Sequence, residues 1–128
     1  WKNWFMDGEQ AGGALLDLHG HDVDQVNCFF GKPKSVTAFG AADIVSKNGG
    51  VDHVVATYDY GDGSLVMAEG GWAAAKSAPF EMSFTIVCEK ATLKLDSTGF
   101  NVFLKNGKKL TPNCELLLEL PLDQEVDY

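Results

Sequence analysis

One stretch of this chain, from Gly12 to Phe30, has the hydrophobic period of a helix, and almost everything after it has the period of strands. The apolar side chains that cluster on one side of this helix are Leu15, Leu16, Leu18, Val23, Val26, Phe29 and Phe30. Gly31 follows directly and Pro33 comes two residues later, which is a normal helix stop. The pattern predicts one amphipathic helix that packs through one face.

The rest of the chain shows alternating segments separated by turn sequences. The predicted strands are Ser35–Phe39, Val54–Tyr60, Leu65–Trp72, Met82–Cys88, Thr92–Asp96, Phe100–Leu104 and Leu116–Leu122. Turns are predicted at Asn48-Gly49-Gly50, Asp62-Gly63 and Asn106-Gly107. Short links favour antiparallel neighbours. We therefore expect an α+β domain: an open, mainly antiparallel β-sheet of about six or seven strands, with a helix packed on one face.

One helix covers only one face of such a sheet. The apolar side chains of Tyr58 and Trp72, and the row from Met82 to Cys88, need cover on the other face. Large exposed apolar patches usually mark interfaces. We therefore expect a homo-oligomer, a dimer or a tetramer, that associates through the sheet face.

Charge and cysteine content narrow the classes of partner. The 128 residues carry a net charge of −8, and every basic residue is lysine. Such a surface argues against nucleic acid and against anionic membranes, and no apolar run reaches the ~20 residues of a membrane helix. The three cysteines, Cys28, Cys88 and Cys114, form neither a CxxC pair nor a disulfide framework, which favours a reducing cytoplasm.

A dense cluster of polar residues lies within the predicted helix. Asp17, His21 and Asp24 stand at positions i, i+4 and i+7, so they share one side of a helix, opposite the apolar stripe. Such a trio is either an ordinary solvated face or a working face, and clustered charges near His favour the second. Cys28, close to the same face, is expected to be a small buried hydrophobe.

His19 falls on the apolar side instead. We expect a core histidine paired with Asp22 three residues later, and no metal ligand. A metal site made of His19, His21 and Asp24 fails on a helix, because residues two apart point in nearly opposite directions. Only in an extended segment would both histidines share a face.

The residues of this segment are similar to a known family. Gly12-Gly13-Ala14-Leu15-Leu16-Asp17, then His21-Asp22-Val23-Asp24 and Gly31-Lys32-Pro33-Lys34-Ser35-Val36, resemble the C-terminal domain of the Gfo/Idh/MocA oxidoreductases, which include glucose–fructose oxidoreductases and inositol 2-dehydrogenases. The hairpin from Asp52 to Trp72 and the segment from Pro79 to Asp96 extend the likeness. His19 and Gly20 depart from it, since the family often has Gly and a β-branched residue there.

The resemblance implies a domain organisation. Residues 1–128 would be a partial C-terminal domain for substrate binding and oligomerisation, and an N-terminal Rossmann domain, absent from this chain, would bind NAD or NADP. The chain has no Gly-rich dinucleotide fingerprint and no Glu-Lys-Pro segment carrying the family's catalytic lysine. We therefore expect this chain alone to be inactive.

The resemblance also implies roles for the polar face. His21 takes the position of the family's catalytic acid/base and Asp17 that of its partner or a substrate ligand, while Asp24 would support the ring or bind a substrate hydroxyl. The implied reaction is oxidation of a secondary alcohol of a sugar, inositol or similar polyol, which requires removal of the hydroxyl proton.

Two other functions fit the same residues. The fold could serve only as a dimerisation or ligand-sensing module, because a fold does not fix a function. A weaker alternative is a metal-dependent hydrolase that uses His19, His21 and Asp24.

Overall fold

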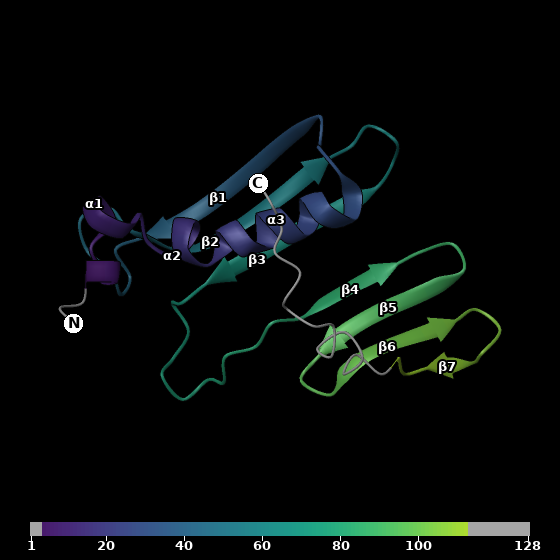
Figure 1. Ribbon diagram of the computed structural model, residues 1–128. Helices are drawn as coiled ribbons and strands as arrows, with labels where there is room; N and C mark the ends of the chain where they lie inside the picture. The colour runs from purple at the N-terminus through teal and green to yellow at the C-terminus, as the bar shows by residue number, and fades with distance from the viewer. Residues whose placement is uncertain (1–3, 113–128) are drawn as a thin grey trace, which may run out of the picture. The chain divides into compact units, whose positions relative to one another are not determined.

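The computed structural model describes residues 4–112, and the chain divides into two compact units after Ala78. The first unit holds the helices and one sheet, and the second unit holds another sheet (Figure 1).

The predicted helix is present, with one break. It is formed by α2 (Ala14–Asp17) and α3 (His19–Phe30), with a turn at Leu18 between them. Gly31 ends α3, and its N–H donates to the carbonyl of Asn27 over 2.8 Å. Two short elements precede this pair: η1 (Trp4–Met6) and α1 (Gly8–Ala11).

The first sheet consists of β1 (Ser35–Ala42), β2 (Val51–Asp59) and β3 (Leu65–Gly71), in that spatial order. Both pairings are antiparallel, as the turn signals predict. Asn48 and Gly63 stand at those turns with positive φ angles of 56° and 90°. β2 is therefore the central strand, and its residues alternate between the two faces of the sheet.

One face of this sheet packs on the helix. The core consists of Val26 of α3 with Ala56 and Tyr58 of β2, surrounded by half-buried residues that pack against it: Tyr60, Val66 and Ala68. Helix α3 lies along this face in Figure 1. Tyr58 was expected on the uncovered face, and that prediction is wrong, because its register in β2 is in phase with Ala56 and places it under α3.

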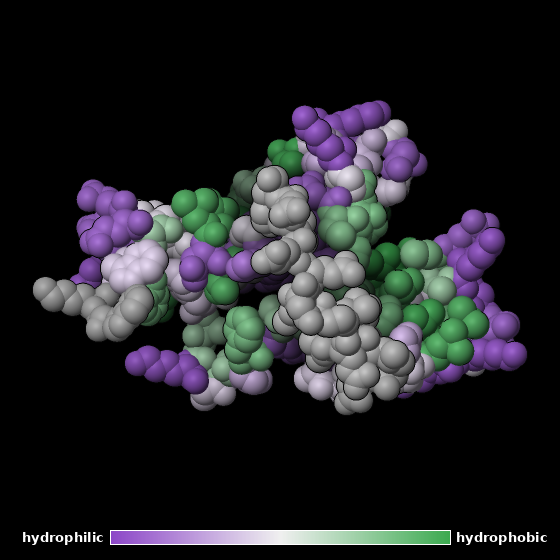
Figure 2. All heavy atoms as spheres, in the orientation of Figure 1, coloured by the Kyte–Doolittle hydropathy of each residue, from purple (hydrophilic) through white to green (hydrophobic). Residues whose placement is uncertain are grey.

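The second sheet contains β4 (Phe84–Val87), β5 (Ala91–Asp96), β6 (Gly99–Leu104) and β7 (Lys109–Leu110), all antiparallel and in sequence order. In Figure 2, hydrophobic side chains gather on the right-hand part of this sheet, and hydrophilic side chains lie at its right edge. The Asn106-Gly107 turn is present, with Gly107 at a φ of 85°.

The α+β class, the antiparallel pairing and the strand number are confirmed, but the described strands divide between two sheets. After Gly71, the Trp72 N–H still donates to the Asp52 carbonyl. The following stretch, 73–83, forms no strand; it has weak alternation and contains Pro79. The predicted strand Leu116–Leu122 lies outside the described residues. Within 4–112, no helix is long and apolar enough to cross a membrane.

Candidate functional site: the outer face of helices α2 and α3

The structure places Asp17, His21 and Asp24 on the exposed side of the helix pair. Asp17 is the last residue of α2, while His21 and Asp24 lie in α3, about 60° apart around its axis. Within the described part of the chain, none of the three side chains forms a hydrogen bond or an ion pair. Within residues 4–112, their polar atoms therefore have no partner.

The start of this helix is fixed on the sheet by a glycine. Gly13 caps α2 with a φ of 74° and forms a bridge with Val51, the first residue of β2. A Cβ on Gly13 would lie 2.5 Å from the backbone nitrogen of Val51, so only glycine fits. Ala14, next in the chain, is fully buried. The Gly-Gly sequence thus sets where Asp17 projects from the sheet.

His19 occupies the opposite side of α3, where it is 2% exposed. Its Nδ1 lies 2.9 Å from Oδ2 of Asp22, so the predicted core histidine with an Asp22 partner is confirmed. The alternative of a metal site made of His19, His21 and Asp24 does not fit this arrangement, because His19 is buried and His21 is exposed. Among the residues of 4–112, no three His, Cys, Asp or Glu side chains are grouped so that they could hold a metal ion.

Cys28 is exposed, so its expected burial is wrong. Cys28 stands seven residues after His21. The helix buries only a narrow row of its side chains against the sheet. That row runs through His19 and Val26, with Asp22 half-buried between them. Phe29 and Phe30 also keep 44% and 37% of their surface exposed.

The sequence interpretation missed the role of Asp52. This carboxylate is fully buried and accepts hydrogen bonds from the backbone N–H groups of residues 44–46 over 2.7 to 3.2 Å, and from the indole of Trp72. Burial by itself would raise the pKa of Asp52, but hydrogen bonds from Ser46 and Trp72 outweigh it and hold the pKa well below its usual value of 3.8. The signal was available: Asp52 is in phase with Val54 and Ala56 on the buried face of β2.

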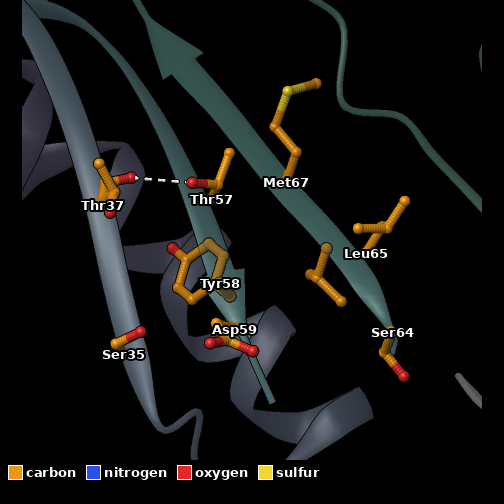
Figure 3. A pocket seen from close by; sticks show the side chains of 9 residues that line it. Ser35, Thr37, Thr57, Tyr58, Asp59, Ser64, Leu65 and Met67 are labelled. Carbon is orange, nitrogen blue, oxygen red and sulfur yellow. Dashed lines mark hydrogen bonds between the residues drawn. The ribbon is translucent and has the colours of Figure 1, made fainter. Parts of the chain in front are cut away.

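The face of β1–β3 turned away from the helix is open. Phe39, Leu65 and Met67 expose 77%, 99% and 62% of their surface there, beside the cross-strand pair of His53 and Glu69, whose Nε2 and Oε1 are 2.9 Å apart. A shallow depression of about 370 Å³ lies on the same sheet. Figure 3 shows its lining across the three strands, with the hydrogen bond from the Thr57 hydroxyl to the Thr37 carbonyl and a helix behind them.

Comparison with known proteins identifies the family of this chain. The model of the GFO/IDH/MocA C-terminal domain matches residues 1–94, which include both helices, the first sheet and the polar face. A comparison with curated proteins gives no match. Proteins of the matched family are generally NAD(P)-dependent oxidoreductases. Because the match spans well over half of the chain and includes the Gly-Gly cap, Asp17, His21 and Asp24, this chain belongs to the GFO/IDH/MocA C-terminal domain family.

Proposed function

We propose that this chain is the substrate-binding domain of an NAD(P)-dependent dehydrogenase that oxidises a secondary alcohol of a sugar, inositol or similar polyol. The observation that carries the proposal is the outer helix face. Asp17, His21 and Asp24 project from one exposed surface, and none of them is engaged by another side chain of the described chain. A hydroxyl-rich substrate offers groups that imidazole and carboxylates bind well.

Each residue has a definable task in this proposal. The neutral His21 imidazole accepts the proton of the substrate hydroxyl as the C–O bond becomes a carbonyl. Asp17, one helical turn earlier, orients the ring and stabilises its charged form. Asp24 accepts a hydrogen bond from a second substrate hydroxyl. A bound nicotinamide supplies the hydride acceptor for the same oxidation.

The described residues do not themselves supply a dinucleotide site. Their strand ladders are all antiparallel, so 4–112 contain no βαβ unit with a Gly-rich turn, which is the usual pyrophosphate cradle. We assign the dinucleotide to a separate Rossmann domain of the protein and expect this chain alone to be inactive. Cys28 and Cys88, free thiols in the described part, support a reducing cytoplasm as its location.

Turnover of His21→Asn in the full-length protein tests the proposal. Sugars and inositols are screened with both dinucleotides, and reduced nicotinamide is followed by its absorbance. Loss of a general base is expected to lower kcat about 10²- to 10⁴-fold. Asn27→Ala, an exposed position of the same helix about 120° around its axis from His21, serves as the control and leaves kcat unchanged. A kcat for His21→Asn equal to that of the control would contradict the proposal.

A second function, oligomerisation with or without catalysis, is favoured by the open face of the first sheet. Phe39, Leu65 and Met67 form an exposed apolar stripe across β1 and β3, which is unusual for a surface that faces only water. We propose that two copies associate through this stripe. In a module without catalysis, assembly would be the whole function.

Sedimentation of charge variants tests this interface. Phe39→Lys and Met67→Lys are expected to convert a dimer or tetramer into a monomer, because each buries an unpaired charge in the interface. Leu110→Lys, an exposed apolar position in β7, is the control and keeps the assembly. Unchanged sedimentation of both Phe39→Lys and Met67→Lys would remove this stripe as the interface.

A further inference from the structure

The junction between α2 and α3 lies between the two proposed site residues, Asp17 and His21. Asp17 ends α2, Leu18 forms a turn, and His19 begins α3. The His21 N–H donates to the Leu18 carbonyl over 3.0 Å, a bond that spans three residues where an α-helix would span four. The two proposed site residues therefore stand on either side of a break, and the helix ladder alone does not fix their relative orientation.

His19 anchors this junction to the sheet. It is 2% exposed, and its Nδ1 lies 2.9 Å from Oδ2 of Asp22 one turn later in α3. When the carboxylate of Asp22 is ionised it can only accept, and Nδ1–H of His19 is then the donor of this bond. The bond ties the first residue of α3 to its second turn.

The pair rests directly on β3 at Gly70. A Cβ at Gly70 would lie 2.3 Å from Oδ2 of Asp22 and 3.1 Å from Nδ1 of His19. The missing side chain of Gly70 therefore provides the space for the pair, and any larger residue would displace it. Asp22 also affects Tyr58 of β2. The pKa of the Tyr58 hydroxyl is raised, first by burial and then by the negative charge of Asp22.

We infer that His19 is a positioning residue, which through Asp22 and Gly70 fixes the α2–α3 junction so that Asp17 and His21 face the same substrate. This inference rests on the proposed function of the outer helix face. His19 touches no substrate in this account, since its side chain is buried on the other side of the helix. Its Nε2 has no hydrogen-bond partner among the described residues, so the Asp22 bond is its one polar anchor there.

Amide hydrogen exchange separates positioning from general stability. His19→Ala is expected to speed exchange of the amides of residues 18–22 about tenfold or more, while the amides of β2 stay protected. His19→Asn restores protection, because its side-chain N–H can replace Nδ1. Gly70→Ala, which displaces the pair from the sheet side, reproduces the His19→Ala pattern. His53→Ala, on the opposite face of the sheet, leaves residues 18–22 unchanged.

Kinetics of the full-length enzyme complete the test. His19→Ala is expected to lower kcat about 10- to 100-fold with KM nearly unchanged, and His19→Asn to recover most of it. Exchange that rises equally over the whole unit, or not at all, would overturn the inference. So would local loosening with unchanged kcat. Failure of the proposed function is recognised separately, because then His21→Asn itself leaves kcat unchanged.

Discussion

The buried carboxylate of Asp52 gives the sharpest prediction about stability. It joins the loop before β2 to the end of β3, since it accepts from the backbone of residues 44–46 and from the Trp72 indole. Both of its oxygens accept hydrogen bonds. Oδ2 accepts from the backbone N–H groups of residues 44–46. Oδ1 accepts from the Trp72 indole and also from the Ser46 N–H, which the two oxygens share. Any substitution at Asp52 therefore leaves donors without an acceptor.

The size of the effect follows from which donors water can reach. Ile44 and Val45 are exposed, so their N–H groups can turn to solvent, whereas Ser46 is buried and Trp72 is half-buried. A buried donor left unpaired costs about 1–3 kcal/mol. Asp52→Ala is thus expected to lower the free energy of unfolding by about 2–6 kcal/mol. Asp52→Asn, which turns its NH₂ toward one donor, is expected to cost about 1.5–3 kcal/mol.

Urea unfolding followed by tryptophan fluorescence measures this loss, and Trp72 is a direct reporter. Asp59→Asn makes the same charge change at an exposed position of the same strand and is expected to change stability by less than about 0.5 kcal/mol. The contribution also depends on pH. Because the folded pKa of Asp52 lies below 3.8, its stabilisation is complete above that pH and is lost as the pH falls further below it. Equal urea midpoints for Asp52→Asn and wild type at neutral pH would refute this reasoning.

Three other outcomes follow from the structure. Asp24→Ala should change the urea midpoint by less than the equivalent of about 0.5 kcal/mol, because its carboxylate is exposed and without a partner in the described chain. Gly13→Ala should lower the unfolding free energy by more than about 1 kcal/mol in the same assay, because its φ of 74° and its approach to Val51 exclude a side chain. In an NMR titration Asp96 should show a pKa of about 2, because hydrogen bonds from Thr98 first and then from Lys94 lower it. Thr98→Val should raise that pKa toward 3.8. An unchanged pKa would show that Thr98 is not the cause.

Several features could be predicted from the sequence because they depend on local periodicity. The helical spacing of 12–30, the turn dipeptides and the alternation of β2 and β3 each require only neighbouring residues. The pairing of His19 with Asp22 was predictable for the same reason, since residues three apart on a helix meet.

Other features depend on contacts distant in sequence. Asp52 reaches Trp72 twenty residues away, and alternation alone shows only that a carboxylate falls on the buried face. The division into two sheets depends on where pairing stops after Gly71. The exposure of Cys28 depends on how narrow a row of the helix the sheet covers. The break in the helix at Leu18 likewise has no signal in the local hydrophobic period.

The central claim is that Asp17 and His21 act together on one substrate, and a double-mutant cycle on kcat of the full-length enzyme tests it most directly. If they act as a unit, Asp17→Asn combined with His21→Asn is no slower than the slower single variant, because removing one partner already removes the function of the pair. Losses that multiply in the double variant, or single variants with wild-type kcat, would contradict the account.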